Sequence, residues 1–330
     1  MMVDLGDVLA ARQVVAAHAW RTPLVESPAL AQRAGADVRL KLECWQRTGS
    51  FKVRGALARV AALIHEGDAR ELVTASAGNH GLGVAYAAQA LGAPRVTIFV
   101  PETAPRAKLE RLAAFDCELR REGHDYDTTH VLAEVYAHER GAFYLSAYDD
   151  PIVIAGQGTV GLEIVEELPE VDVVVVPIGG GGLIAGTAVA VRAANPAVRV
   201  VGVQPEASPA AYLSFRDGHV YERYDAGPTL CDGLAGGFGR VPFEVARDLV
   251  DEVLVVPEAD VREAVRWLVA HEQIVVEGSG AIAVAPLLNG QLDAAGRKVV
   301  AVLTGRNIDA AVLAEILGVG KTVLDTDLHG

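Results

Sequence analysis

Short apolar runs rich in β-branched residues alternate with segments of helical periodicity along almost the whole chain. The apolar runs predict strands at residues 37–42, 96–100, 171–178, 198–203 and 298–304. The helical periodicity predicts helices at residues 53–65, 80–91, 104–115, 127–140, 157–168, 182–194 and 258–271. Regular alternation of strands and helices is typical of an α/β fold with mainly parallel sheets. No break in composition marks a linker, so two domains would be interleaved, with the chain crossing between them more than once.

Composition narrows the classes of partner and compartment. The chain has 330 residues, of which 51% are hydrophobic, and this suits two domains or one large one. A net charge of −14 disfavours nucleic acid and anionic membranes as partners. Cys44, Cys117 and Cys231 are widely spaced without a CxxC pair, which predicts a reducing cytoplasm and neither a disulfide frame nor a zinc site. The N-terminus MMVDLGD lacks the layout of a secretory signal.

Residues 173–191 form a stretch of 19 residues without a charge, which is close to membrane-spanning length. Pro177 and the four glycines at 179–182 interrupt it, so we predict a buried strand, a glycine loop and a helix start instead. Glycines at the start of a helix let backbone amides approach an anion, and the helix dipole favours negative charge there. The glycine cluster therefore favours a phosphate site over the alternative of a tight turn with close packing.

A second glycine motif, GQGTVG at 156–161, fits the dinucleotide pattern G-x-G-x-x-G. That pattern should be followed, about 20 residues later, by an acidic residue at the end of the next strand. Here the next strand ends in the glycine cluster, and the acidic residues come too early. We therefore favour a helix start with close packing over a nucleotide site.

Three further stretches carry candidate chemistry. In RTGSFKVRGA, 47–56, Lys52 follows a turn and begins an amphipathic run, so it is either a solvated lysine or a reactive one. In TASAGNHGLG, 74–83, the small and amide side chains could hold a carboxylate at a helix N-terminus; the alternative is a simple helix cap, and His80 alone would be structural. In LTGRNID, 303–309, Thr304 could be a hydrogen-bonding group or part of a turn.

Taken together, these segments resemble the serine/threonine dehydratase family of pyridoxal-phosphate (PLP) enzymes of fold type II, which also includes serine racemases. The motifs occur in the expected order and cover nearly the whole chain: KLECWQRTGSFKVRGA, SAGNHGLGVAYAA, IAGQGTVGLEI, VVPIGGGGLIAG, CDGLAGGFG, VVEGSGAIAVA and VLTGRNID. The resemblance implies two interleaved three-layer α/β/α domains with PLP in the cleft between them. We assign residues 1–47 plus 149–330 to a large PLP-binding domain and 48–148 to a small, substrate-closing domain. In this family GQGT opens a helix and binds no nucleotide.

The resemblance also implies a role for each site residue. Lys52 forms the Schiff base with PLP, and Phe51 packs against the cofactor ring. The other residues implied to bind the cofactor are Asn79, Gly179, Gly180, Gly181, Gly182, Leu183, Glu277 and Thr304. Those implied to bind the substrate are Ser76, Gly78, Asn79, His80 and Gly233, to which we add Arg306. A Schiff-base lysine must be partly desolvated so that its pKa falls and a neutral amine is available.

The implied activity is that of an ammonia-lyase in amino-acid catabolism, which converts L-threonine or L-serine to a 2-oxo acid and ammonia. Lys52 takes the Cα proton as general base, and the β-hydroxyl leaves. Thr304, as a hydroxyl at the pyridine nitrogen, makes the ring a weaker electron sink than a carboxylate would, which favours elimination. Racemases of the family have a second serine where this chain has Ala77, so racemisation is disfavoured.

Other departures from the family concern metal and substrate. Both acidic positions of the family's divalent-cation site are replaced, by Gln204 and Ala210, so we predict no bound metal there. Leu82 replaces a common glutamine and Arg306 a glycine. An arginine there either receives a second anionic group of the substrate or pairs with a nearby acidic residue. A larger hydroxylated amino acid, as in the hydroxyectoine-utilisation branch, is therefore an alternative substrate.

Two more classes stay open, namely a β-replacement synthase and, from outside the enzymes, a non-catalytic binder of PLP or amino acids. The presence of Lys52 disfavours the binder. The family suggests a homodimer. The chain ends soon after the last motif, so we expect no C-terminal regulatory domain and no feedback inhibition by isoleucine at such a domain.

Overall fold

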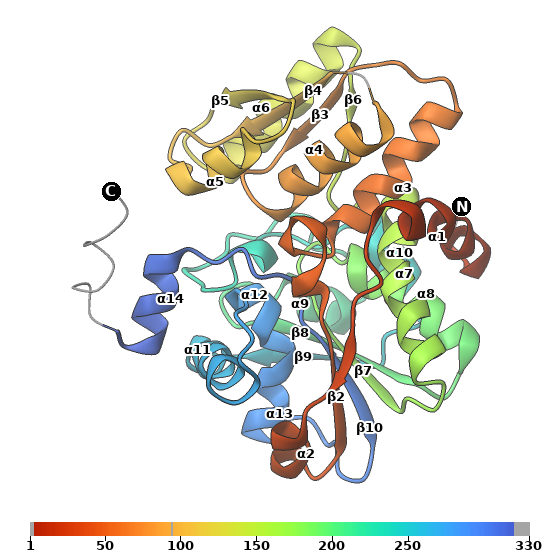
Figure 1. Ribbon diagram of the computed structural model, residues 1–330, viewed down its shortest axis with the longest axis vertical. Coiled ribbons are helices and arrows are strands. Elements are labelled where there is room, and N and C mark those ends of the chain that lie inside the picture. The colour runs from red at the N-terminus through yellow and green to blue at the C-terminus, as the bar shows by residue number, and fades with distance from the viewer. Residues whose placement is uncertain (1–2, 94, 320–330) are drawn as a thin grey trace.

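The computed structural model describes residues 3–93 and 95–319, and within them the strands form two sheets (Figure 1). The first is a 6-stranded sheet in the order β1-β2-β10-β7-β8-β9, in which only β1 is antiparallel. Its strands are β1 (Leu24–Glu26), β2 (Asp37–Lys41), β7 (Val173–Pro177), β8 (Arg199–Pro205), β9 (Glu252–Val256) and β10 (Lys298–Val302). The second is a 4-stranded parallel sheet in the order β5-β4-β3-β6. Its strands are β3 (Leu72–Ala75), β4 (Val96–Val100), β5 (Glu118–Arg121) and β6 (Phe143–Tyr144).

Helices cover both faces of each sheet. Those of the first half are α1 (Leu5–His18), α2 (Pro28–Ala34), α3 (Lys52–His65), α4 (Asn79–Leu91), α5 (Arg106–Leu112), α6 (Tyr126–Arg140) and α7 (Pro151–Glu167). Those of the second half are α8 (Gly182–Ala194), α9 (Ala210–Asp217), α10 (Arg240–Ala246), α11 (Glu258–Trp267), α12 (Gly278–Ala281), α13 (Ala285–Asn289) and α14 (Ala310–Leu317). The mixed α/β fold with mainly parallel sheets is therefore confirmed.

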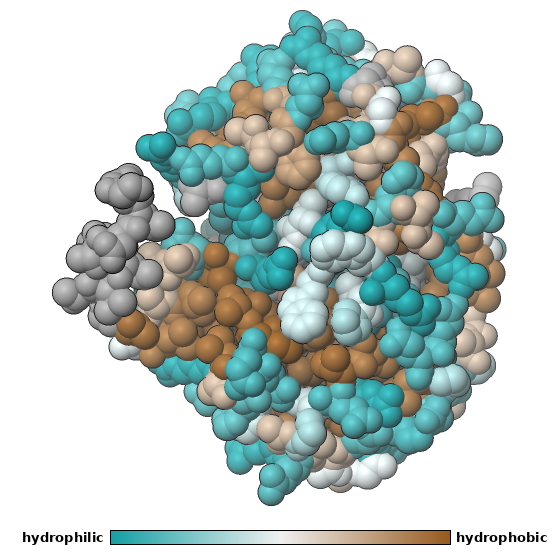
Figure 2. All heavy atoms as spheres, viewed as in Figure 1, coloured by the Kyte–Doolittle hydropathy of each residue, from teal (hydrophilic) through white to brown (hydrophobic). Residues whose placement is uncertain are grey.

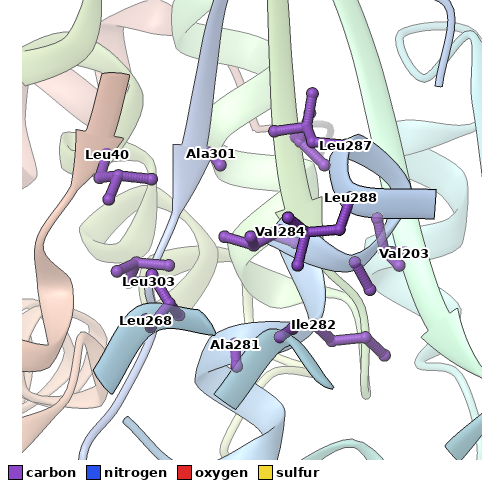
Figure 3. Packing of buried hydrophobic residues seen from close by; sticks show 14 of the residues in the cluster. Leu40, Val203, Leu268, Ala281, Ile282, Val284, Leu287, Leu288, Ala301 and Leu303 are labelled. Carbon is purple, nitrogen blue, oxygen red and sulfur yellow. The ribbon is translucent and has the colours of Figure 1, made fainter. Parts of the chain in front are cut away.

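Alternation along the strands explains why the valine runs have no polar positions. In the larger sheet, Val173 and Val175 belong to the core under α11 and α13, whereas Val174 and Val176 belong to the core that includes α8. Successive side chains of a strand point to opposite faces, so a sheet covered on both faces needs apolar residues throughout. Figure 3 shows one of these cores, where Leu40, Ala301 and Leu303 lie near the helical residues Leu268, Ala281 and Leu287.

The predicted strands all form, with ends within two residues of those predicted. The sequence pattern predicted no strand at β1, β5, β6 or β9. It predicted β3 only as a short strand before Ser76, without a residue range. Helix α11 ends at Trp267, and a π-helical turn occupies 268–272, where a continuous helix was predicted. The uncharged stretch at 173–191 divides into β7, the glycine loop and most of α8, as predicted. Among the described residues, no helix is long and apolar enough to cross a membrane.

The GQGTVG motif lies inside α7, which begins at Pro151, so the prediction of a helix start there is wrong. Its glycines allow close helix packing. A Cβ on Gly156 would lie 2.6 Å from the carbonyl oxygen of Arg54 in α3, and one on Gly158 would lie 2.8 Å from that of Gly186 in α8. Helix α7 therefore packs closely between α3, which begins with Lys52, and α8, which begins at the glycine loop.

Candidate active site

The turn that precedes Lys52 is tied to the end of β10. Phe51 donates its backbone N–H to the carbonyl oxygen of Thr304 at 3.2 Å, and Ser50 and Gly305 form an isolated antiparallel bridge. Helix α3 begins at Lys52 itself. Two segments at opposite ends of the chain thus place Lys52 and Thr304 next to the same short bridge.

Backbone conformation explains the Thr-Gly pair in this turn. Thr48 has φ 63° and Gly49 has φ 79°, both in the left-handed region that favours glycine. A Cβ on Gly49 would lie only 2.5 Å from Oδ1 of Asn307. Asn307 also donates from Nδ2 to the carbonyl oxygen of Thr48 at 2.9 Å, so its side chain braces the turn that carries Lys52.

The Lys52 amine is desolvated and has few polar neighbours. Nζ donates to the carbonyl oxygen of Ala147 at 3.3 Å and lies 5.3 Å from the centroid of the Phe51 ring. Burial lowers its pKa from 10.5 to about 8, and the carboxylate of Glu277 opposes this shift. An appreciable fraction of neutral amine is therefore present near neutral pH, so Lys52 is not a solvated lysine at a helix surface.

The glycine loop forms a cradle without side chains at the N-terminus of α8. Gly181 has φ 94°, and α8 has no side-chain cap. A Cβ on Gly180 would lie 2.2 Å from Cδ1 of Tyr148, and one on Gly181 would lie 2.1 Å from Cε2 of Phe238. The amides of the first turn, including that of Leu183, are available to an anion such as a phosphate, and the helix dipole favours negative charge there.

A second helix N-terminus belongs to the asparagine loop. Helix α4 begins at Asn79 and also lacks a side-chain cap, so the alternative of a simple helix cap is not what the structure shows. Instead, Gly78 donates its N–H to Oγ of Ser76 at 3.2 Å. His80 is 5% exposed, and its Nε2 lies 3.0 Å from the carbonyl oxygen of Leu145. Burial and the charge of Lys52 lower the pKa of His80 to about 3, so the ring is neutral.

Three side chains from distant segments form a hydrogen-bonded network beside this loop. Asn79 donates from Nδ2 to Oε1 of Glu277 at 2.6 Å and accepts from Nδ2 of Asn307 at 2.5 Å. Asn307 donates its backbone N–H to Oε2 of Glu277 at 3.1 Å. Burial and the nearby charge of Asp232 raise the pKa of Glu277 to about 7. Sequence reasoning missed Asn307, although it stands in the LTGRNID motif one residue after Arg306.

Thr304 and Gly233 are linked through a residue that sequence reasoning also missed. Thr304 is 4% exposed and donates from Oγ1 to the carbonyl oxygen of Ser279 at 3.0 Å. Gly233 donates its N–H to Oγ of Ser279 at 3.1 Å. Thr304 is thus a buried hydrogen-bonding hydroxyl at the end of β10, while Ser279 joins it to the loop of Gly233.

Two residues singled out for their departure from the family lie elsewhere. Leu82 is 4% exposed and packs in the core of the smaller sheet. Arg306 is exposed and lines a separate pocket of about 360 Å³ together with Trp20, Arg21, Thr22, Pro23 and Trp45. Within residues 3–93 and 95–319, no carboxylate pairs with the guanidinium of Arg306, so the alternative of an ion pair with a nearby acidic residue is not seen there.

The segment at 204–210 uses its polar atoms internally. Gln204 is fully buried, donates from Nε2 to the carbonyl oxygen of Ile178 at 3.2 Å and accepts from the N–H of Tyr212 at 2.9 Å. Across the described part of the chain, no group of three or more His, Cys, Asp or Glu could hold a metal ion. The absence of a bound metal at this segment remains a prediction.

The grouped residues fit PLP. The glycine cradle and the uncapped N-terminus of α8 suit its phosphate, and the partly neutral Lys52 amine suits its aldehyde. Phe51, Asn79, Glu277 and Thr304 come together around the same turns and loops, and Arg306 does not join them through its side chain. The individual roles of these residues remain predictions.

Comparisons with known proteins agree with this arrangement. Residues 15–305 match the family described as pyridoxal-phosphate dependent enzyme. The L-threonine ammonia-lyase of Thermotoga maritima is 42% identical over 97% of this chain and 79% of its own. The solved structure of a T.th. threonine deaminase has a TM-score of 0.85, with 37% identity over 93% of this chain and 99% of that one. Maize serine racemase has a TM-score of 0.88, with 31% identity over 96% of this chain and 97% of that one.

The family match covers most of the chain, and the relatives cover it almost completely at identities of 31–42%. The motifs that carry the resemblance are also the segments that meet at the candidate site. This chain belongs to the pyridoxal-phosphate dependent enzymes, and among them to the serine/threonine dehydratase family.

Proposed function

We propose that this chain is a PLP-dependent ammonia-lyase that converts a β-hydroxy amino acid, such as L-threonine or L-serine, to a 2-oxo acid and ammonia. The observation that carries the proposal is the Lys52 amine, whose pKa burial lowers to about 8, together with two helix N-termini that have no side-chain cap. One N-terminus suits a phosphate and the other a carboxylate. The relatives named L-threonine ammonia-lyase and threonine deaminase support this substrate class.

Each group of residues has a defined task in this proposal. PLP would supply the electron withdrawal that makes the proton at Cα of the amino acid acidic. The amides of 179–183 would hold its phosphate, and Phe51, Asn79, Glu277 and Thr304 would bind its ring. The N-terminus of α4, with Ser76 and Gly78, receives the carboxylate of the substrate.

Lys52 acts on the proton at Cα. An amine with a pKa of about 8 is partly neutral at physiological pH, and its neutral form can accept the proton. Thr304 is a neutral hydroxyl held by the carbonyl oxygen of Ser279, so it places no negative charge beside the ring nitrogen. Without such a charge the ring is a weaker electron sink, which favours loss of the β-hydroxyl over transamination.

Elimination is favoured over racemisation because Ala77 stands where racemases of the family carry a serine. A methyl group can neither donate nor accept a proton, so the face opposite Lys52 has no base at this position. The likeness to maize serine racemase therefore concerns the fold and the cofactor site.

Threonine and serine are favoured over a larger hydroxylated amino acid. That alternative depended on Leu82 and Arg306, but Leu82 packs in a core and Arg306 lines a pocket apart from the other predicted site residues.

A spectrum and a product assay test the proposal. The purified protein should absorb in the Schiff-base band and should form 2-oxo acid from L-threonine or L-serine within a panel of β-hydroxy amino acids. Lys52→Ala should lose both, while Lys298→Ala, a change of a surface lysine paired with Glu170, should lose neither. A Schiff-base band without any 2-oxo acid would remove the function and leave the cofactor site, and a band that persists in Lys52→Ala would remove the cofactor lysine.

The proposal extends to assembly, location and domain limits. We expect a homodimer, and Figure 2 shows a broad hydrophobic area on the larger-sheet part of the molecule, near α11 and α14, that a second copy could cover. Light scattering after size exclusion measures the mass of the assembly.

Three free cysteines support a cytoplasmic location. The division into 1–47 plus 149–330 and 48–148 is supported by the smaller sheet, whose strands lie between Leu72 and Tyr144, and limited proteolysis tests it.

A further inference from the structure

The GQGTVG motif contains one residue that close helix packing does not explain. Its glycines are needed because α7 lies against α3 and α8. Gln157 stands between the first two of them, is 1% exposed, and belongs to the same interface, since a Cβ on Gly55 of α3 would lie 3.2 Å from its Cγ. An apolar side chain of the same size would fill this space without the cost of burying an amide.

Gln157 and Lys52 share one acceptor. Nε2 of Gln157 donates to the carbonyl oxygen of Ala147 at 3.1 Å, and Nζ of Lys52 donates to the same oxygen at 3.3 Å. No other hydrogen bond of Nζ is formed among the described residues. The side-chain amide of Gln157 is therefore bonded to the same carbonyl oxygen of Ala147 that accepts from the Lys52 amine.

The other end of the amide faces the phosphate cradle. Oε1 of Gln157 is buried and has no hydrogen-bond partner within residues 3–93 and 95–319. A Cβ on Gly182 would lie 2.4 Å from this oxygen, so Gln157 helps to explain why the first residue of α8 is a glycine. A single buried side chain thus reaches both the carbonyl oxygen that accepts from Lys52 and the first residue of α8.

We propose that Gln157 is a positioning residue, which orients the carbonyl of Ala147 so that this oxygen holds the Lys52 amine in place without adding a negative charge. The inference rests on the proposed role of Lys52 as the cofactor lysine. A glutamate of the same shape would bring a carboxylate next to the amine and favour its protonated form. A methionine would keep the volume and remove the hydrogen bond to Ala147.

Other charged groups around Lys52 support the need for a neutral neighbour. Glu277 is the carboxylate whose charge raises the pKa of the amine, against the larger effect of burial. His80 has a pKa of about 3 and stays neutral at working pH. A second carboxylate within about 4–6 Å would raise the pKa of Lys52 by roughly 1–3 units and would remove most of the neutral amine at pH 7.

The experiment uses the apoprotein, so it does not depend on turnover. Acetylation of Lys52 by acetic anhydride is followed by peptide mass spectrometry across pH 6–11 in wild type, Gln157→Glu and Gln157→Met. The wild type should titrate with a midpoint of about 8. The midpoint of Gln157→Glu should rise by roughly 1–3 units. Gln157→Met should bind PLP roughly two- to tenfold more weakly, as expected for the loss of one hydrogen bond.

Two further results show whether Gln157 positions the Lys52 amine, or whether any buried substitution or a loss of folding gives the same effect. Gln204→Glu, another fully buried glutamine that donates to a backbone carbonyl, is the matched control and should leave the Lys52 midpoint unchanged. If Gln157→Glu does not fold, Gln157→Met decides alone. Wild-type PLP affinity in a folded Gln157→Met overturns the proposal, whatever Gln157→Glu does. A failure to form 2-oxo acid in the wild type would remove the proposed reaction and leave these measurements intact.

Discussion

The fully buried guanidinium of Arg54, two residues after Lys52, offers the sharpest prediction about stability. It donates to both oxygens of Glu43 at 2.7 and 2.8 Å and to both oxygens of Glu163 at 2.7 and 2.9 Å. Lys41 adds a second cation 2.7 Å from Glu163. Replacing Arg54 by methionine removes one cation from this network and keeps most of the buried volume.

The magnitude follows from which carboxylate is left alone. Glu163 keeps the amine of Lys41, whereas Glu43 keeps only the hydroxyl of Thr22. Leaving one buried carboxylate without its cation lowers the free energy of unfolding by about 3–5 kcal/mol, and leaving two would lower it further. We therefore expect Arg54→Met to lower the free energy of unfolding by about 3–5 kcal/mol at pH 7. Glu43→Gln in the Arg54→Met background should restore about half of the loss, because the stranded charge is gone.

Urea unfolding followed by tryptophan fluorescence measures the change, and pH provides a second test. Burial raises the pKa of Glu163, but the ion pairs with Arg54 and Lys41 outweigh it and leave the pKa below the usual 4.5. Such a carboxylate stabilises the folded state above its unfolded pKa and loses this contribution as pH falls through the folded value. The difference between wild type and Arg54→Met should therefore shrink below pH 4.5.

An exposed ion pair is the control. Arg106 and Glu110 form an i,i+4 pair whose side chains are 91% and 61% exposed, so Arg106→Met should have no resolvable effect on unfolding. A loss under about 1 kcal/mol for Arg54→Met at pH 7, or a loss that does not change with pH, would refute the reasoning.

Three other substitutions test the site. Gly180→Ala places a Cβ 2.2 Å from the ring of Tyr148, so PLP should bind at least about tenfold more weakly in equilibrium dialysis. Burial raises the pKa of Glu277 from 4.5 to about 7, so the folded wild type loses stability as this group ionises between pH 4.5 and 7. Glu277→Gln should remove this part of the pH dependence of stability. Asn307→Ala removes the hydrogen bonds to Asn79 and the turn at 48–49, so the free energy of unfolding should fall by about 1–3 kcal/mol.

Each of these predictions has a matched control. Gly227→Ala meets its nearest atom at 3.7 Å and should bind PLP as the wild type does. Asp293→Asn, at an exposed position after α13, should keep the wild-type pH dependence of stability. Gln89→Ala, at an exposed position of α4, should change unfolding by less than about 0.5 kcal/mol. Equal effects in a test variant and its control would contradict the corresponding prediction.

Local pattern made much of the fold and part of the candidate site predictable. Successive side chains of a strand point to opposite faces of the sheet. A valine run without polar positions therefore predicts a strand that is covered on both faces, as in β7. A glycine cluster between a strand and a helix predicts a loop that leaves amides free, as before α8. Short edge strands such as β5 and β6 were less predictable, because pairing with a neighbour rather than residue pattern defines them.

Tertiary contacts decided what the same residue types do in different places. The glycines of GQGTVG and of 179–182 look alike along the chain and both sets are closely packed, yet the first lies inside α7 and the second precedes and begins α8, whose N-terminus has no side-chain cap. Arg306 and Lys52 are both cations beside a glycine-containing turn, but one is exposed in a pocket and the other is desolvated, with a pKa of about 8. The sequence by itself determined most of the helices and the central strands, because periodicity and backbone freedom are local. Burial and long-range hydrogen bonds decided reactivity, because they depend on which distant segments meet.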